Sequence, residues 1–326
     1  MLLSIIVPVY NTSQYLEGCI RSITANDCSD CEIILVDDGA TDGICPAMCN
    51  RLAAGNPGLI RVIHQQNQGV GSARNTGIES ARGEYLFFPD SDDTITSNAL
   101  SVLKKAICET RADVVAFNLY SDDGQGKYTP IDANYIQPEG VFTAAEKPEF
   151  LLSLPSAWSR VWKRSLFMDA GIRYPSRVWY EDLRTSMKLF VLAQSIVAIP
   201  DRLYLYLQRP GSIMRSTNVD RNREIIDAFQ DLLTWFREQG LWETFREPLC
   251  RLCVDHLYIA ASVRVLRADP RHRLLAEFQS YLQENFPNYQ ENPLLSQLSF
   301  PHKLALRLLD RKHYRLLKWL FGFKRT

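Results

Sequence analysis

Three carboxylates lie within four residues in the block Asp90-Ser91-Asp92-Asp93, directly after an apolar run at 85–89. Carboxylates this close repel one another, so a fold retains them only beside a counter-charge or a cation. Hard divalent cations such as Mg²⁺ and Mn²⁺ prefer oxygen ligands, and a diphosphate is their usual companion. We therefore predict a site for Mn²⁺ or Mg²⁺, with Asp92 as principal ligand, Asp90 as second ligand and Asp93 in support. The alternative is a solvated acidic loop that caps a helix at 94–103.

Two further apolar runs also end in polar residues. The run at 4–10 ends in Asn11, and the run at 32–36 ends in Asp37 and Asp38. Short runs of Val, Ile and Leu predict strands that are buried on both faces of a parallel sheet. In open α/β sheets the ligand binds beyond the carboxyl ends of the strands. The polar clusters are therefore expected to converge on one cleft.

Helical periodicity predicts the elements that connect these strands. Apolar residues at helical spacing predict a crossover helix at 13–24, and a Gly-rich turn from residue 67 leads into a helix that opens on Arg74. Further elements are a helix from about 142 to 154 and two short strands at 195–199 and 202–208. The predicted fold class is α/β, with a mostly parallel, Rossmann-like sheet flanked by helices and a helical C-terminal extension.

Four blocks of the chain resemble the signature motifs of family 2 glycosyltransferases, in the family's order and at its spacing. They are Pro8-Val9-Tyr10-Asn11, Val36-Asp37-Asp38-Gly39-Ala40-Thr41-Asp42, Ala73-Arg74-Asn75-Thr76-Gly77 and Asp90-Ser91-Asp92-Asp93. The resemblance implies a GT-A fold, a nucleotide-sugar donor, a divalent metal and inversion at the anomeric carbon. It covers residues 1 to about 120 and, less closely, 150 to 215. Ala40 stands where the family usually has Ser, so Thr41 or Asp42 must cap the following helix.

The resemblance also implies how the nucleoside is held. One Asp of the pair Asp37 and Asp38 accepts a hydrogen bond from the base, most naturally from the imide of uracil, and we favour Asp38. Pro8, Tyr10 and Asn11 are expected to line the nucleoside pocket. Tyr10 either stacks on the base there or simply packs.

Arg74 and Ser91 complete the predicted donor-binding set around the acidic block. The planar fork of Arg74 suits phosphate or carboxylate, and in the family this position reaches toward the nucleotide and the acidic cluster. The alternative is a structural ion pair between Arg74 and either Asp90 or Asp38.

A base and a lid complete the predicted chemistry. Glu181 and Asp182 resemble the Glu-Asp motif of many inverting members, in which the Asp takes the proton of the acceptor hydroxyl. The alternative is that both are ordinary acidic residues in the first turn of a helix, where the helix dipole favours them. The polar, Gly-containing segment 209–216 is a candidate lid, in which Arg209 or Arg215 folds onto the diphosphate. The alternative is a loop that makes no such contact.

Composition restricts the class of protein. The chain has 326 residues, 46% of them apolar, and a net charge of +0, which gives no reason to expect a nucleic-acid partner. We find no signal peptide, and no apolar run approaches the ~20 residues that span a bilayer. We therefore expect a cytoplasmic protein whose eight cysteines are thiols.

Two parts are predicted along the chain. Residues 1–217 form a catalytic domain, with a nucleotide-binding half at 1–93 and an acceptor-binding half at 94–217, and residues 218–326 form a helical region. Its end, 302–325, combines basic and apolar residues in a pattern that suits an anionic membrane surface. Such a contact would bring the enzyme to a lipid-linked acceptor on the inner face of the cytoplasmic membrane. The alternative is packing on its own domain or on a second subunit of a homo-oligomer.

The predicted function is an inverting, metal-dependent glycosyltransferase that moves a hexosyl or N-acetylhexosaminyl group from a nucleoside-diphosphate sugar, favouring UDP. The acceptor is a hydroxyl of a growing glycan, in bacterial surface polysaccharide or lipopolysaccharide synthesis. One alternative is a catalytically inactive relative that binds nucleotide-sugar and acts as a partner protein. A nucleotidyltransferase is a third possibility, but it would need a Gly-rich loop with Lys or Arg after the first strand, where this chain has Asn11-Thr12-Ser13.

Overall fold

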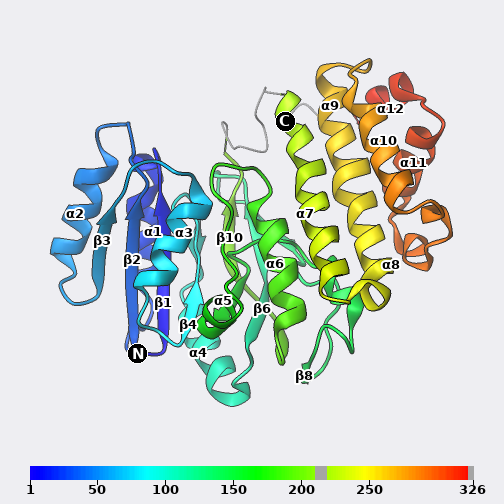
Figure 1. Cartoon of the computed structure of the whole chain (residues 1–326). Helices are drawn as coiled ribbons and strands as arrows, with labels where there is room; N and C mark the ends of the chain where they lie inside the picture. The colour runs from blue at the N-terminus through cyan, green and yellow to red at the C-terminus, as the bar shows by residue number, and fades with distance from the viewer. Residues whose placement is uncertain (210–218, 322–326) are drawn as a thin grey trace. The chain divides into compact units, whose positions relative to one another are not determined.

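A computed structural model of the chain describes residues 1–209 and 219–321, and the chain forms two compact units, Met1–Pro210 and Gly211–Thr326 (Figure 1). Every strand among the described residues lies in the first unit. The functional division made above, with a catalytic domain at 1–217 and a helical region at 218–326, stays a prediction.

The first unit is built on one mixed sheet, with strands in the order β3-β2-β1-β4-β9-β6-β10-β5, while β7 pairs with β6 and β8 with β10. The strands are β1 Leu3–Val9, β2 Cys31–Asp37, β3 Ile60–His64, β4 Tyr85–Phe87, β5 Thr94–Ile95, β6 Val114–Asp122, β7 Tyr128–Ile131, β8 Val141–Phe142, β9 Arg160–Lys163 and β10 Ile196–Leu207. The first four strands are parallel, and every residue of β1 and β2 is buried, as the apolar runs predict. β9 lies antiparallel between β4 and β6, so the second half of the sheet is mixed.

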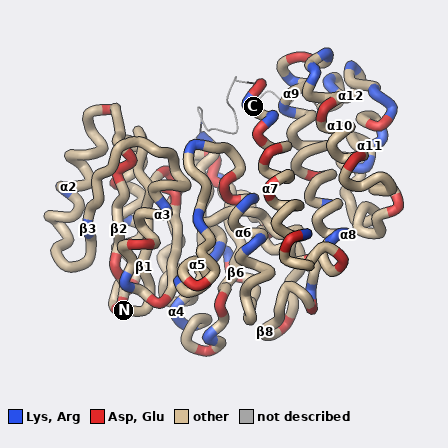
Figure 2. The backbone as a smooth tube through the Cα atoms, in the orientation of Figure 1, with Lys and Arg blue, Asp and Glu red and all other residues tan. Residues whose placement is uncertain are grey.

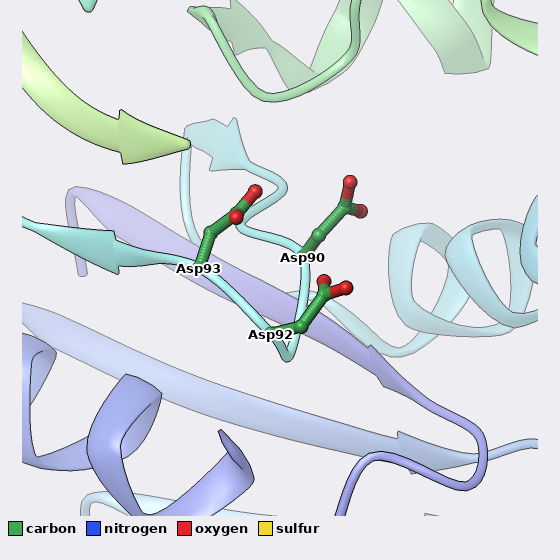
Figure 3. A group of neighbouring side chains, drawn as sticks. All are labelled: Asp90, Asp92 and Asp93. Carbon is green, nitrogen blue, oxygen red and sulfur yellow. The ribbon is translucent and has the colours of Figure 1, made fainter. Parts of the chain in front are cut away.

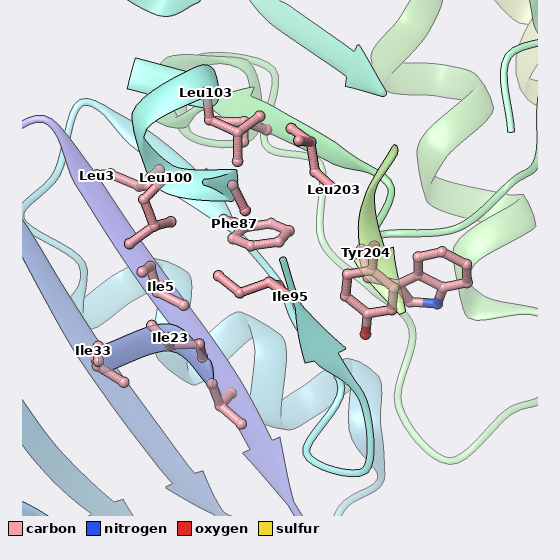
Figure 4. Packing of buried hydrophobic residues seen from close by; sticks show 14 of the residues in the cluster. Leu3, Ile5, Ile23, Ile33, Phe87, Ile95, Leu100, Leu103, Leu203 and Tyr204 are labelled. Atoms are coloured by element: carbon pink, nitrogen blue, oxygen red, sulfur yellow. The ribbon is translucent and has the colours of Figure 1, made fainter. Parts of the chain in front are cut away.

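Helices cover both faces of this sheet. They are α1 Ser13–Thr24, α2 Cys45–Gly55, α3 Val70–Ser80, α4 Ala99–Thr110, α5 Arg164–Asp169 and α6 Glu181–Leu192, with a 3₁₀ helix η1 at Pro148–Leu152. Apolar residues of α1, α2 and α4 share one core with the side chains at Leu3, Ile5 and Val7 of β1 (Figure 4). α3 lies on the opposite face, where Gly77 faces Ile6: a Cβ at Gly77 would lie 2.2 Å from Ile6 Cγ2. Only glycine allows α3 to approach the sheet this closely.

Helix α3 begins at Val70, four residues before the predicted start at Arg74. The reason is that the Gly-rich run belongs to the helix entrance. Gly69 adopts a left-handed φ of 88° and donates its N–H to Asp38. At Gly71 a Cβ would lie 2.3 Å from the Pro175 carbonyl oxygen. The glycines therefore admit a neighbouring segment to the first turn of the helix and do not delay its start.

Two other predicted elements differ from the structure. The predicted helix from about 142 to 154 is the short strand β8 followed by the 3₁₀ helix η1, whose first residue is Pro148. The two short strands predicted at 195–199 and 202–208 are one strand, β10, with irregular pairing between Ala198 and Tyr204. Tertiary pairing with β6 holds both halves of β10 in one sheet, which local sequence does not indicate.

The second unit is helical over its described residues. Its elements are η3 Val219–Arg223, α7 Glu224–Glu238, α8 Trp242–Leu252, a π-helical segment η4 Cys253–Ala261, α9 Ser262–Ala268, α10 Leu274–Asn285, η5 Tyr289–Glu291, η6 Pro293–Gln297, α11 Phe300–Asp310 and α12 Tyr314–Phe321. α8, η4 and α9 follow one another without a break, and Pro248 lies inside α8. Within 1–209 and 219–321, the helices all fall short of the length and apolarity that a bilayer crossing needs.

Candidate active site

The acidic block lies on the loop that follows β4. One carboxylate oxygen from each of Asp90, Asp92 and Asp93 lies within 4.8 Å of the others (Figure 3). Three oxygen donors at this separation are a suitable partial ligand set for a hard divalent cation. The loop is held by Tyr204 of β10, whose hydroxyl accepts the backbone N–H of Asp90 at 3.0 Å.

Asp93 has a different environment from the other two carboxylates. It is 1% exposed, one oxygen accepts from the Tyr204 hydroxyl at 2.7 Å, and the other accepts from the Leu207 N–H at 2.8 Å. Burial, followed by the charges of Asp90 and Asp92, raises the pKa of Asp93 well above the ordinary carboxyl value. These contacts tie the acidic loop to the end of β10. The structure therefore gives Asp93 a positioning role, and ligation by Asp93 stays a prediction.

Arg74 connects the acidic loop to the start of α6. Its side chain is 2% exposed, and one terminal nitrogen bonds to Asp182 at 2.6 Å and to Glu181 at 3.1 Å. The other terminal nitrogen bonds to Asp90 at 3.0 Å. Of the two structural ion pairs considered for Arg74, the structure contains the one with Asp90. A single guanidinium thus holds together three carboxylates that come from two distant parts of the chain.

Asp182 stands at the first turn of α6, after Tyr180, which has a left-handed φ of 64°. Its second oxygen accepts the Ala157 N–H at 3.1 Å. Burial raises the pKa of Asp182, while the positive charge of Arg74 opposes that rise. A carboxylate that is harder to keep ionised is a stronger base, and both of its oxygens are held in place here. The position suits the predicted proton acceptor, and that role stays a prediction.

Asp37 and Asp38 are both buried at the carboxyl end of β2. One oxygen of Asp38 accepts from the Gln68 N–H at 2.9 Å, and the other accepts from the Gly69 N–H at 2.8 Å. Asp37 bonds to the Ala40 N–H at 3.0 Å and, through its other oxygen, to a ring nitrogen of His64. Each aspartate therefore organises a loop. A carboxylate has about four lone-pair sites, so each keeps capacity for a base, and which of them binds it stays a prediction.

The predicted nucleoside-pocket residues lie at the end of β1 or directly after it. Pro8 is buried within the strand, whereas Tyr10 is exposed. Asn11 has a left-handed φ of 52°, and its side-chain oxygen accepts the N–H groups of Thr41 and Asp42 at 2.8 and 3.1 Å. Asn11 thus links the ends of β1 and β2, which brings two of the predicted polar clusters together.

Two smaller contacts complete this edge of the sheet. Ser91 is buried, and its hydroxyl lies 2.8 Å from the hydroxyl of Thr12, which joins the acidic loop to the end of β1. Asp42 accepts the N–H groups of Ile44 and Cys45 at 3.0 and 2.9 Å. Ile44 stands at the N-cap position of α2, so neither candidate is the cap residue itself, but Asp42 accepts the N–H of the first helical residue, Cys45.

Arg209 lies two residues after Leu207, the last residue of β10. Its Nε atom bonds to the Asp92 carboxylate, and its guanidinium lies 5.3 Å from the centre of the Tyr15 ring. Arg215 and the rest of the predicted lid, 210–216, lie outside the described residues. The contact of Arg209 with a metal-ligand candidate was not anticipated from the sequence.

Two further residues that position the site, Asn75 and Tyr174, are not predicted from the sequence. The Asn75 side chain makes a paired contact with the backbone of Tyr174, donating to its carbonyl oxygen at 2.8 Å and accepting its N–H at 2.9 Å. Tyr174 in turn lies against the guanidinium of Arg74, 5.3 Å from ring centre to carbon. Asn75 was visible as a motif residue beside Arg74, but nothing in the sequence around Tyr174 indicates its role.

Comparisons with known proteins agree on the family. The model of glycosyl transferase family 2 matches residues 4–165. The glycosyltransferase GlyG of Streptococcus pneumoniae serotype 4 is 34% identical over 248 residues, covering 70% of this chain and 78% of GlyG. TarS of Staphylococcus aureus, a poly(ribitol-phosphate) beta-N-acetylglucosaminyltransferase, is 26% identical over 230 residues, covering 67% of this chain but 38% of TarS.

Two solved structures have the same fold. The crystal structure of TarS 1-349 with UDP-GlcNAc gives a TM-score of 0.65 at 21% identity, covering 98% of this chain and 90% of that chain. The mannosyltransferase PcManGT of Pyrobaculum calidifontis, with GDP-Man and Mn²⁺, gives 0.58 at 16% identity, covering 99% and 88%. At these identities the two structures establish the GT-A fold and nothing finer. The family match and the similarity to GlyG go further: the chain belongs to glycosyl transferase family 2 and is a glycosyltransferase.

Proposed function

We propose that this chain is an inverting, cation-dependent transferase that moves a sugar from a UDP-sugar to a hydroxyl of a bacterial surface glycan. The observation that carries the proposal is the Arg74 network, in which one buried guanidinium joins Asp90 of the acidic loop to Asp182 at the start of α6. This contact supports the proposal, because Asp90 is proposed to bind the donor side and Asp182 to accept the proton, and both are held by the same side chain. The bound UDP-GlcNAc of TarS favours UDP, and the polymer named for TarS favours a cell-surface acceptor.

Asp92 and Asp90 are proposed to hold the cation, because their oxygens lie together and Asp93 is engaged by Tyr204 and Leu207. When bound, a Mn²⁺ or Mg²⁺ ion would supply Lewis-acid neutralisation of the leaving diphosphate. The protein's own contribution on this side is electrostatic. Arg74 balances the charge of Asp90, which keeps the loop from being forced apart by its own carboxylates.

Asp182 is proposed to accept the proton of the attacking hydroxyl. As that proton moves to a carboxylate oxygen of Asp182, the acceptor oxygen forms a bond to the anomeric carbon and the bond to the diphosphate oxygen breaks. The electron pair of that bond leaves with the diphosphate. Because attack and departure occur on opposite faces of the sugar, one displacement inverts the anomeric carbon. Arg74 and the Ala157 N–H orient the carboxylate before the reaction.

The test measures release of nucleoside diphosphate from a panel of UDP-, GDP- and dTDP-sugars with Mn²⁺, alongside donor binding by calorimetry. We expect one donor to be hydrolysed slowly, and EDTA or Asp92→Asn to abolish that hydrolysis. Asp182→Asn should bind the donor like the wild type but lose about 10²- to 10⁴-fold of transfer to a glycan acceptor. Glu181→Gln is the matched control, since Glu181 shares Arg74 but is not the proposed base, and it should lose much less.

Two results would contradict the proposal. If Asp182→Asn transferred sugar as fast as the wild type, Asp182 would not be the base. If no donor bound or reacted, with or without the cation, the chain would be better described as an inactive relative that acts through a protein partner.

We also infer that the basic end of the second unit docks on an anionic membrane. In α12, Leu317 is buried, and it lines a small hollow with Val263 and Leu266 of α9. One apolar stripe of α12 therefore packs inside the second unit. A second stripe, Leu316, Trp319 and Leu320, stays exposed, with Trp319 at 63%.

Charge favours an anionic surface as the occupant of this second stripe. Between 303 and 318 the chain has six cationic residues and one carboxylate; the cations are Lys303, Arg307, Arg311, Lys312, Arg315 and Lys318. Figure 2 shows Lys and Arg along the α11–α12 end. The one carboxylate, Asp310, is engaged by the Tyr289 hydroxyl. The remaining basic residues of the predicted patch, at 324 and 325, lie outside the described residues.

Sedimentation with vesicles tests this contact. The protein should bind vesicles that contain phosphatidylglycerol and not vesicles of phosphatidylcholine alone, and Trp319→Ser should weaken binding about tenfold while folding normally. Equal binding to both kinds of vesicle, or none to either, would contradict the inference. Self-association that Trp319→Ser abolishes would instead assign this stripe to a second subunit.

A further inference from the structure

The two proposed cation ligands are each paired with an arginine, but the two arginines differ in burial and in the number of carboxylates they contact. Asp90 is paired with Arg74, which is 2% exposed and also bonds to Glu181 and Asp182. Asp92 is paired with Arg209, which is 24% exposed, and among residues 1–209 and 219–321 Asp92 is the one carboxylate that forms an ion pair with that guanidinium. Release of Arg74 would strand three carboxylates, whereas release of Arg209 would expose one.

The Arg209 guanidinium bonds to the carboxylate that is proposed to bind the cation. It bonds to the Asp92 carboxylate through Nε while its central carbon lies over the Tyr15 ring, so it is held from two sides. A divalent ion bonded to the same carboxylate would stand a few ångströms from this positive charge. Like charges at that separation repel, by several kcal/mol even at the effective dielectric of a protein surface, ~20. The ion and the guanidinium therefore compete for Asp92.

We propose that Arg209 is a built-in substitute for the cation: it neutralises Asp92 until cation and nucleoside diphosphate arrive together, and then transfers to the diphosphate. The proposal rests on the proposed function, since it takes Asp92 as a cation ligand. A guanidinium suits both partners, because its fork matches a carboxylate and a phosphate equally well. Arg209 lies two residues beyond the end of β10, so it can leave Asp92 without disturbing the Leu207 N–H bond that anchors Asp93.

A thermodynamic consequence follows. The cation alone must displace Arg209 without compensation, so it binds weakly. With a diphosphate present, the displaced guanidinium gains a new anionic partner, so cation and diphosphate strengthen each other's binding. This coupling would limit capture of free Mn²⁺ or Mg²⁺ by the site when no donor is bound.

The experiment measures Mn²⁺ binding directly, from the electron paramagnetic resonance signal of free Mn²⁺, with and without saturating UDP. The proteins are the full-length wild type, Arg209→Gln and Asp92→Asn. The matched control is Arg202→Gln, because Arg202 lies in β10 and pairs with the exposed Asp132 instead of with Asp92. No turnover is needed for this readout.

We expect Arg209→Gln to bind Mn²⁺ alone about fivefold to tenfold more tightly than the wild type, as removal of one partly exposed competing charge implies. UDP should enhance Mn²⁺ affinity in the wild type, and this enhancement should shrink by about the same factor in Arg209→Gln. Arg202→Gln should behave as the wild type in both measurements.

Two results would overturn the proposal, and they are distinguishable. If the wild type binds Mn²⁺ through Asp92 but Arg209→Gln binds it with equal or lower affinity, Arg209 is not a substitute for the cation while the cation site stands. If neither wild type nor Arg209→Gln binds Mn²⁺, even with UDP, the cation site of the proposed function fails and Arg209 has nothing to replace.

Discussion

Charged residues are used in opposite ways in the acidic network of the first unit and at the α11–α12 end of the second. Around Arg74, one buried guanidinium bonds to three carboxylates, so each of these carboxylates has a fixed partner. At the α11–α12 end, six cations accompany exposed apolar side chains and a single carboxylate. In the first arrangement each charged group has a partner inside the fold, whereas the second leaves its basic side chains for an external surface.

The difference shows that buried charges and exposed charges serve different functions. A buried ion pair must be complete, because removing one partner leaves a desolvated charge behind. Such a pair fixes the positions of side chains and so suits a catalytic centre. Exposed cations contribute little to folding. They remain available for binding, and the fold tolerates their replacement.

Loss of the Arg74 charge should give the largest effect on folding. Arg74→Met removes the partner of three carboxylates, and we expect it to lower the free energy of unfolding by about 3–5 kcal/mol. Arg21→Met is the matched control, because Arg21 pairs with Glu17 on the surface of α1 and is 77% exposed. It should cost at most about 1 kcal/mol. Urea denaturation followed by circular dichroism measures both, and equal losses would show that burial of the Arg74 network is unimportant.

The second largest effect should be the difference in stability between substitutions in the buried and in the exposed apolar stripe of α12. Leu317→Ala empties a buried position and should destabilise the protein by about 2–5 kcal/mol. The neighbouring Leu316→Ala, at an exposed position, should change stability by less than about 0.5 kcal/mol. Thermal unfolding of the two variants beside wild type provides the comparison. A large loss for Leu316→Ala would mean that the exposed stripe is already packed against a partner in solution.

The pH dependence of transfer should show the smallest effect. Burial raises the pKa of Asp182, and Arg74 only partly offsets the rise. The proposed base works when ionised, so the rate should fall as pH decreases, and should begin to fall at a higher pH than for an exposed carboxylate. At pH values below the pKa of Asp182, the rate should drop about tenfold for each pH unit.

Turnover must be separated from donor binding, because burial also raises the pKa of Asp90. Measuring the rate with saturating donor and cation, and donor affinity separately across the same pH range, makes that separation. A flat rate down to the range of ordinary carboxyl groups would remove Asp182 as the base.

Several elements could be predicted from local sequence, and others could not. Residues 13–24 and the parallel strands β1 and β2 follow from apolar periodicity and agree with the structure. The prediction of a helix at 142–154 was wrong, because the helix-compatible residues in this stretch do not reveal that β8 pairs with β10. In the same way, the start of α3 depends on what the glycines approach, which is a segment about a hundred residues away.

The sequence by itself determined the family, the carboxylates at the strand ends and the amphipathic character of the C-terminal helices, because these are patterns of residue type over short distances. Tertiary structure decided the partners. Arg74 and Asp182 are separated by 108 positions, and Arg209 and Asp92 by 117. The sequence does not indicate which side chain each of Asp90, Asp92 and Asp93 contacts. Folding pairs the first with Arg74, the second with Arg209 and the third with Tyr204. Burial makes these assignments, since a desolvated charge is stable only beside the partner that the fold brings to it.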